Sequence, residues 1–322
     1  MHKLITFILL IILMSIASCE KVLDEKIEYW DTKVVLHGYL YPNQKVKVYL
    51  HESKLHELEG DEEYISPFKS LTEAEVELYE EGRFVSKLQY VTDSIFYYPF
   101  DIHQDACFIS QDFKPKSGRK YSIKVITEEH PLVEATTHIP EPTAILSLTS
   151  ERILKKIDSR LFESNRCVLT FEDNPNQDDY YGFDAKKAPG GSENHVSFQP
   201  QDPGIEYPPL FRDHLIINDA YNLILDGGFG GSYMPGDIDT IYATLQLLTV
   251  TRDHYLYHKS LLESERRDNL PYLQDIHLPI TEPTQIYTNV KNGLGLFTGI
   301  AYDADTVQTI FYHHTNPVNQ MP

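Results

Sequence analysis

Short segments of alternating apolar and polar residues recur along the chain from residue 33 onward. In residues 46–50, Val46, Val48 and Leu50 fall on one face of an extended segment, because successive side chains of a strand point to opposite sides. Similar short segments are residues 34–36, 75–79, 83–90 and 120–127. Their spacing predicts a mainly β fold that begins with an N-terminal Ig-like β-sandwich domain, residues 33–140.

A proline-rich segment marks the end of this first domain. Residues 137–143 contain Pro140 and Pro142, and proline has no amide hydrogen to donate to a neighbouring strand. Beyond them, strand-like segments resume at residues 144–148, 167–171 and 179–183. We therefore expect a second, β-rich domain, residues 141–322.

The second domain is predicted to combine long loops with one prominent helix. Residues 186–209 are polar and contain prolines, and residues 225–231 contain two Gly-Gly pairs, so we expect a long loop and a hairpin turn there. Residues 249–267 contain neither proline nor glycine, which favours a helix. Its side chains at helical spacing are Tyr255, His258, Leu261 and Leu262.

The first 18 residues have the layout of a secretory signal. A positive charge at Lys3 precedes an apolar run from Leu4 to Met14, and small residues precede Cys19. The run is too short and too interrupted to match the roughly 20 apolar residues of a membrane-spanning helix. We therefore predict that residues 1–18 are a signal peptide that is removed.

Cysteine at the first mature position resembles the lipobox of bacterial lipoproteins, whose peptidase cuts before a lipidated cysteine. The resemblance implies a covalent diacylglycerol and a fatty acid such as palmitate on Cys19, and no other cofactor is expected. Each buried methylene contributes about 0.8 kcal/mol, so several acyl chains anchor a protein. Residues 19–32 are polar and are predicted to form a tether. An ordinary signal followed by an incidental cysteine is the alternative.

Acidic residues clearly outnumber basic ones. The chain has 28 Lys and Arg and 48 Asp and Glu residues, a formal net charge of −20. Without the signal peptide and its one lysine the balance is 27 against 48, or −21. Nucleic acids and anionic lipid headgroups bind basic patches, so neither is expected as a partner. A well-solvated surface is the simpler consequence of this charge.

Two cysteines remain besides Cys19. Cys107 and Cys167 each lie in an apolar, strand-like segment, and they fall in different predicted domains. We therefore expect two buried free thiols. A disulfide between them is the alternative, because exported proteins meet oxidising conditions.

Two histidines of the predicted helix have the spacing of some zinc sites. His254 and His258 are four residues apart and so share one helix face. A hydrolytic zincin would have glutamate directly after the first histidine, where this chain has Tyr255. We predict that the pair belongs to a half-buried helix face and not to a metal site.

An acidic segment, residues 172–179, is rich in oxygen atoms that could bind a cation such as Ca²⁺. It lacks the central glycine and the closing glutamate of an EF-hand loop. We therefore interpret it as an acidic loop between strands and predict no metal there. The weak candidate ligands in this segment are Asp173, Asn176, Asp178 and Asp179.

The sequence contains no recognisable catalytic motif. It has no Gly-x-Ser-x-Gly motif, and glycine-rich residues 227–231 lack the Lys-Ser/Thr pair and the following helix of a phosphate loop. The 22 tyrosines suit carbohydrate stacking or a protein interface, and they equally suit the faces of strands. We predict no catalytic residue and expect a protein that is not an enzyme.

Several segments resemble the domain-of-unknown-function family 4249 (DUF4249) of Bacteroidota lipoproteins. They are residues 19–24, 117–125, 135–142, 171–173, 179–181, 210–213, 253–261 and, as the most specific one, 282–297. Members of this family are typically encoded near TonB-dependent outer-membrane transporters. The resemblance therefore implies an accessory role in nutrient uptake, and the family has no established catalytic residues to carry over.

Residues 282–297 also have a physical interpretation. Gly293 and Gly295 are expected to permit a turn with positive φ and a close approach of the backbone. Tyr287 and Asn289 are expected to brace that turn by hydrogen bonds. The side chains expected to pack inward are Leu294, Leu296 and Phe297.

Together these features favour a lipid-anchored outer-membrane accessory protein that binds a TonB-dependent transporter or its nutrient ligand without catalysis. Acidic residues soon after the cysteine resemble export signals of surface lipoproteins, which favours exposure at the cell surface; they are Glu20, Asp24 and Glu25. One alternative is a protein that binds or hydrolyses glycans or peptides through loops of the second domain. Another is a structural component of the envelope.

Overall fold

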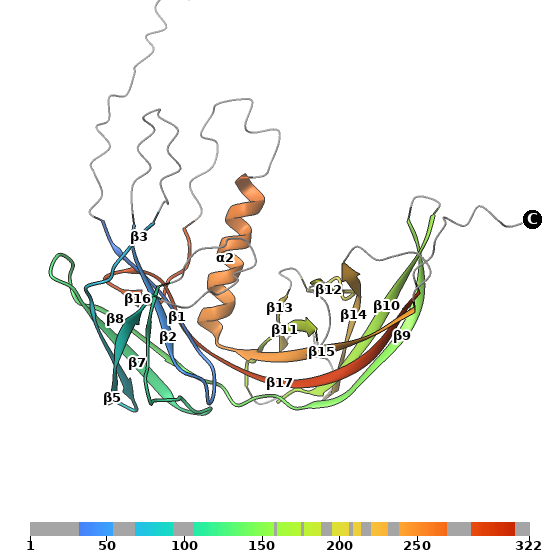
Figure 1. The fold of residues 1–322 in the computed structure, drawn as a ribbon, viewed down its shortest axis with the longest axis horizontal. Helices are drawn as coiled ribbons and strands as arrows, with labels where there is room; N and C mark the ends of the chain where they lie inside the picture. Colours follow the sequence, from blue (N-terminus) through green and yellow to red (C-terminus); the bar gives the residue numbers. More distant parts are fainter. Residues whose placement is uncertain are drawn as a thin grey trace, which may run out of the picture.

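The computed structural model consists mainly of β-strands (Figure 1). It describes residues 32–53, 68–92, 106–157, 160–174, 177–187, 195–205, 209–213, 220–230, 238–268 and 285–312. The predictions for the signal peptide, for Cys19 and for nearly all of the tether lie outside these residues. Within the described residues, two sheets and one helix make up the fold, so the mainly β prediction is confirmed.

The first part of the chain forms a curled portion of the larger sheet. Its strands are β1 (Val34–Leu40), β2 (Lys47–Ser53), β3 (Phe68–Ser70), β4 (Glu75–Glu80), β5 (Arg83–Val91), β6 (Cys107–Ile109), β7 (Lys120–Ile126) and β8 (Val133–His138). Neighbouring strands follow the order β1-β2-β6-β5-β4-β7-β8, and β3 pairs with β2. The strands predicted from period-two patterns are all present, whereas the Ig-like sandwich stays a prediction.

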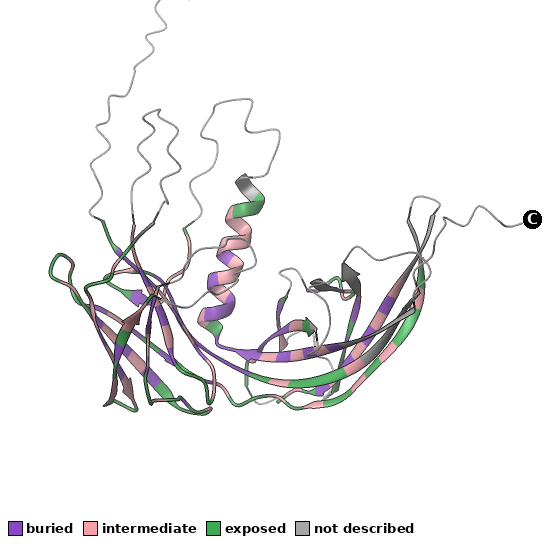
Figure 2. Ribbon diagram, viewed as in Figure 1, coloured by how far each residue is buried: buried purple, intermediate pink, exposed green. Residues whose placement is uncertain are grey.

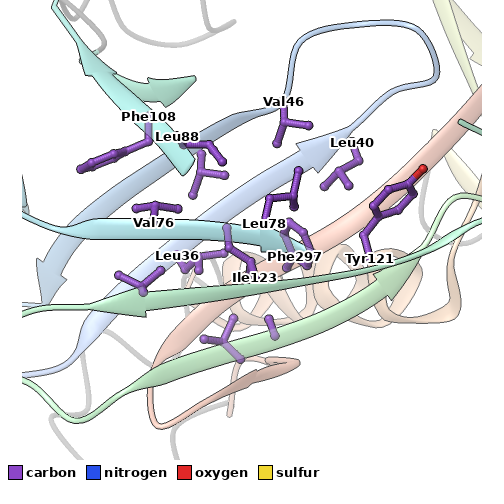
Figure 3. Close-up of a cluster of buried hydrophobic side chains, with 14 of the residues drawn as sticks. Leu36, Leu40, Val46, Val76, Leu78, Leu88, Phe108, Tyr121, Ile123 and Phe297 are labelled. Atoms are coloured by element: carbon purple, nitrogen blue, oxygen red, sulfur yellow. The ribbon is translucent and has the colours of Figure 1, made fainter. Parts of the chain in front are cut away.

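Side chains from both ends of the chain fill the core inside this curl (Figure 3). Alternate residues of β7, namely Tyr121, Ile123 and Val125, are buried, as a strand with one face toward the core requires. Leu36 of β1 and Phe297 near the C-terminus belong to the same cluster. The core therefore depends on residues that are more than 250 positions apart in the sequence, since 297 − 36 is 261.

A second core involves both sheets. The smaller sheet has the order β12-β14-β10-β9, and the larger one ends in β15-β11-β13. Phe171 and Leu223 of the smaller sheet share a buried cluster with Tyr181 and Leu247 of the larger one. The strands are β9 (Ile145–Ile157), β10 (Arg160–Glu172), β11 (Tyr180–Lys187), β12 (His195–Pro200), β13 (Leu210–Arg212), β14 (Ala220–Gly230) and β15 (Ile238–Val250).

Two loop predictions in this region are wrong. Residues 225–231 are predicted as a hairpin turn, but through Gly230 they continue β14, which pairs with β10 on one side and β12 on the other. Pairing with β12 holds Gly227, Gly228 and Gly230 extended, with β10 also pairing at Gly227, and this overrides the preference of glycine for turns. Strand β12 itself lies within residues 186–209, which are predicted as a loop.

The last strand of the described residues, β17 (Leu294–Tyr312), runs past both cores. Through Gly299 it pairs with β1 in parallel, and from Ile300 onward it pairs with β15 in antiparallel orientation. The larger sheet therefore continues across the predicted domain boundary, although residues 139–144 of the chain itself form no strand. The two domains stay a prediction.

Glycines allow β17 to lie against neighbouring backbone. Gly295 has a φ of +99°, and a Cβ atom there would overlap the carbonyl oxygen of Leu36. A Cβ atom at Gly299 would overlap the carbonyl oxygen of His138 in the same way. The close backbone approach predicted at Gly295 is confirmed. Leu294, predicted to pack inward, is instead 37% exposed, because it is the first residue of the strand and lies outside the core cluster.

Helix α2 (Arg252–Asp268) begins later than the predicted residue 249, because β15 continues to Val250. Thr251 is its N-cap, since Thr251 Oγ1 accepts a hydrogen bond from the backbone N–H of His254 at 3.2 Å. Among the described residues, no helix is long and apolar enough to cross a membrane.

Helix α2 packs where the two cores meet, with its buried residues on the side of the sheet (Figure 2). Tyr255 lies in a small cluster with Tyr180 of β11 and Ile300 of β17. The Tyr257 hydroxyl lies 2.7 Å from His37 Nε2 of β1. The helix therefore contacts strands that border each of the two cores.

The residues before β16 (Val290–Lys291) tie the helix to β17. Asn289 accepts the Phe297 N–H at 3.0 Å and donates to the Phe297 carbonyl oxygen at 2.8 Å. It also donates to Asp253 Oδ2 at 3.1 Å, and the Tyr287 hydroxyl donates to Asp253 Oδ1 at 2.5 Å. Asn289 therefore braces the turn as expected, whereas Tyr287 holds the first turn of the helix.

Candidate functional site

The start of β1, the end of β2 and the β7–β8 loop meet at one end of the first core. The antiparallel register of the first two strands sets Val34 opposite Glu52. Asn292, in the turn between β16 and β17, donates a hydrogen bond to the carbonyl oxygen of Leu132 in the β7–β8 loop at 2.9 Å. Segments that are far apart in the sequence therefore share this end of the molecule.

A cavity of about 680 Å³ opens among these segments. Its walls are residues 32–34, 129–131 and 292–293. Small-molecule sites in proteins span roughly 300–1,000 Å³. The cavity is therefore large enough for a small ligand or for a side chain of a partner protein.

Three side chains that can bind a metal ion converge beside this cavity. Glu52 at the end of β2, and Glu129 and His130 in the β7–β8 loop, place their ligand atoms within 4.8 Å of one another. The side chains of Glu52 and His130 are only 12% and 6% exposed. Glu129 is exposed, and together with His130 it lines the cavity. The cluster is therefore largely enclosed and open on one side.

Neighbouring residues hold this cluster in place. Thr32 Oγ1 donates a hydrogen bond to Glu52 Oε1 at 3.0 Å, and the backbone N–H of His130 donates to Thr127 Oγ1 at 3.1 Å. His130 Nε2 lies 3.3 Å from Glu52 Oε1. This contact lacks the angles of a hydrogen bond, and Nε2 is buried without a hydrogen-bond partner among the described residues. A buried polar ring nitrogen thus lies beside two carboxylates.

The sequence prediction did not include Glu52, Glu129 or His130. Glu52 lies 77 positions before Glu129 (129 − 52), and no known motif has this spacing. The sequence alone therefore gives no reason to group Glu52 with Glu129 and His130. The available signal was the sequence Glu128-Glu129-His130 directly after a predicted strand, which by itself is typical of an exposed loop.

The predicted candidates His254 and His258 lie where α2 faces β1. Their ring centroids are 4.4 Å apart, and the ring of His254 lies edge-on to Tyr39. Burial lowers the pKa of both histidines, and His258 lowers the pKa of His254 further. Neither belongs to the cluster of three metal-type ligands found in the described residues. The absence of a metal at this pair stays a prediction.

His37 extends this group of histidines onto β1. Burial lowers its pKa to about 4, with smaller contributions from the nearby rings of His51 and His258. A neutral ring can exchange a hydrogen bond with the Tyr257 hydroxyl, which lies 2.7 Å from Nε2. Helix α2 is therefore attached to β1 through the uncharged form of His37. Protonation of His37 in acid should weaken this attachment.

The candidate ligands of the acidic segment do not form a group of their own in the described residues. Asp173 accepts a hydrogen bond from the Tyr181 hydroxyl at 2.6 Å, and Asp179 accepts two from Gln177 Nε2 at 2.9 and 2.8 Å. These two carboxylates therefore have internal partners. The other two candidates are Asp178, which is exposed, and Asn176, which lies outside the described residues.

The two remaining cysteines are free and buried, as predicted. Cys107 lies on β6 and Cys167 on β10, where it belongs to the second core. Burial raises the pKa of the Cys167 thiol to about 11, so it stays protonated at neutral pH. Cys167 therefore acts as a small apolar side chain.

The described residues define a mainly β protein, in which two cores share one long final strand and a single helix packs at their junction. The chain belongs to the family described as Domain of unknown function (DUF4249), whose model matches residues 20–306. The resemblance identified in the sequence is thereby confirmed at the level of the family. No curated protein matches this sequence.

Proposed function

We propose that this protein is a lipid-anchored, non-catalytic accessory protein of a bacterial outer membrane that binds a TonB-dependent transporter or its nutrient ligand. The observation that carries the proposal is the sequence Ile16-Ala17-Ser18-Cys19 after a positive start and an apolar run. Lipid on Cys19 would confine the protein to a membrane surface and raise its local concentration near membrane partners.

The position of the cavity supports this proposal. Thr32 lines the cavity and follows Cys19 by 13 positions, 32 − 19. A flexible chain of that length typically spans about 20 Å. A tether of that length between a lipid on Cys19 and Thr32 would keep the cavity near the membrane surface, within reach of a membrane-embedded transporter or its ligand.

The anchor and the partner can be tested in the same cells. Cys19→Ala should abolish incorporation of a labelled palmitate analogue and release the protein from the membrane fraction. Cys167→Ala, which removes a buried thiol, should leave the labelling and the membrane association unchanged.

The partner is tested by cross-linking intact cells and extracting them with mild detergent, which should recover a transporter with the wild-type protein. Repeated recovery of the wild-type protein alone would remove the support for a transporter partner, and label that persists in Cys19→Ala would disprove the anchor.

A further inference from the structure

We propose that Glu52, Glu129 and His130 form a binding site for a divalent transition-metal ion at the wall of the cavity, with Zn²⁺ as the ion that fits best. This inference goes beyond the proposed function and does not depend on it, because it rests on the geometry of the folded chain alone. A metal at this position would join the end of β2 to the β7–β8 loop.

One distance within the cluster matches the spacing of ligands around a metal ion, and the third ligand lies close enough to reach it. Zn²⁺ binds histidine nitrogen and carboxylate oxygen at about 2.0–2.2 Å, so two neighbouring ligand atoms lie roughly 3.0–3.6 Å apart. His130 Nε2 and Glu52 Oε1 are 3.3 Å apart. The ligand atoms of all three residues lie within 4.8 Å of one another, and Glu129 is exposed and can turn its carboxylate inward. Small rotations of one side chain therefore complete three ligands.

The buried ring nitrogen of His130 is the observation that points to a ligand. Buried polar atoms in folded proteins nearly always have a hydrogen-bond partner, and exceptions call for an explanation. His130 Nε2 is buried without one among the described residues, although a carboxylate oxygen lies 3.3 Å away. An ion pair with protonated histidine would direct the N–H at that oxygen, which the contact does not do. If Nε2 of neutral His130 and Oε1 of Glu52 both bind one metal ion, the 3.3 Å between these atoms and the missing hydrogen bond are both explained.

Charge favours a cation in the same place. Glu52, which is partly buried, and Glu129, which is exposed, bring two carboxylates close together, and like charges at this separation repel each other. A divalent ion between them neutralises both charges. It also leaves the neutral imidazole of His130 as the third ligand, as metal binding requires.

The mixture of ligand types selects the ion. Ca²⁺ and Mg²⁺ prefer sites made of oxygen atoms only, whereas imidazole suits transition metals such as Zn²⁺. One nitrogen and two carboxylates are within the ligand range of Zn²⁺, and three protein ligands leave one position open. Because Glu129 and His130 also line the cavity, that open position is available to water or to an oxygen atom of a bound ligand.

Thr32 extends the site toward the N-terminus. Its hydroxyl donates to Glu52 Oε1, which is the type of outer contact that orients a metal-binding carboxylate. Metal binding would therefore fix not only the β7–β8 loop but also the residue at which the predicted tether meets the folded body.

Zinc titration of the full chain, purified in detergent and stripped with a chelator, tests the site. We expect one Zn²⁺ per chain to bind and to raise the thermal unfolding temperature. His130→Ala and Glu52→Gln should each weaken Zn²⁺ binding at least tenfold. Ca²⁺ and Mg²⁺ at the same concentrations should give no comparable shift.

Matched controls separate loss of ligands from loss of folding. Glu129→Gln alters an exposed side chain, so it should fold normally and still lose at least tenfold in Zn²⁺ affinity. Glu128→Gln makes the same charge change one position earlier, and His138→Ala removes an exposed histidine of β8; both should keep the wild-type affinity within about twofold. Wild-type affinity in Glu129→Gln would overturn the proposal.

X-ray absorption of the zinc-loaded wild-type protein gives a second, independent measurement. The site predicts one imidazole and otherwise oxygen ligands. A spectrum with sulfur ligands, or with two imidazoles as His254 and His258 would supply, would place the ion elsewhere and refute the assignment.

Discussion

Gly295 is the residue whose substitution should disturb the fold most directly. Its φ of +99° is unfavourable for any other residue, and a Cβ atom would overlap the carbonyl oxygen of Leu36. We expect Gly295→Ala to lower the free energy of unfolding by about 2–4 kcal/mol, because both strain and overlap must be relieved. Urea unfolding followed by circular dichroism measures this change.

Gly82 provides the control for that substitution. It also has a positive φ, +78°, but a Cβ atom there meets nothing within 4 Å. Gly82→Ala should therefore cost only about 1 kcal/mol, from the backbone conformation alone. If Gly295→Ala and Gly82→Ala lowered the free energy of unfolding equally, overlap with the backbone of β1 would not add to the cost of substituting Gly295.

The partly buried His37 should lower the stability of the protein in acid. Its pKa falls from 6.5 to about 4 on folding, mainly through burial. Between these pH values the unfolded chain binds a proton that the folded chain does not, so the free energy of unfolding decreases as the pH falls below 6.5. We expect a decrease on the order of 2 kcal/mol from this residue between pH 7.5 and pH 5.

Urea unfolding at both pH values measures this effect. His37→Gln should reduce the pH dependence, while His138→Gln, at an exposed position of β8, should leave it unchanged. His254 and His258 act in the same direction, since burial lowers the pKa of each. A wild-type pH dependence in His37→Gln would mean that other groups cause the acid sensitivity.

Among the elements, helix α2 depends on a few polar contacts at its N-terminal end. The Tyr287 hydroxyl donates to Asp253, a carboxylate in the first turn that also interacts favourably with the helix dipole. We expect Tyr287→Phe to lower the free energy of unfolding by about 1–2 kcal/mol, because a hydrogen bond to a charged group is lost. Tyr302→Phe, at a 36% exposed position of β17, should change it by less than about 0.5 kcal/mol. Equal effects would contradict the assigned role of Tyr287.

The elements also show where a sequence pattern suffices and where it fails. Period-two patterns predicted β4 and β7 because alternate residues of each strand are buried. The helix was predictable because residues 249–267 contain no residue that breaks one. The glycines of β14 misled the prediction, because their pairing with β12 is a property of the sheet and not of the local sequence.

For the whole molecule, the candidate site was the least predictable feature. Glu52 reaches Glu129 and His130 only because the larger sheet curls and brings the end of β2 toward the β7–β8 loop. Such a meeting depends on strand order and register, which a single sequence does not specify. The free thiols, by contrast, were predictable, because burial in separate strands follows from local apolar context.

The pairing of β1 with β17 has a consequence for how the protein is made. A ribosome completes residue 35 long before residue 294, its partner in the parallel register, 259 positions later (294 − 35). Until the final strand emerges, one edge of β1 has no neighbour and can pair with other nascent chains. A product that stops short of β17 lacks Phe297 and Ala301 of the first core. The chain must therefore be synthesised through β17, and kept from aggregating, before the first core can close.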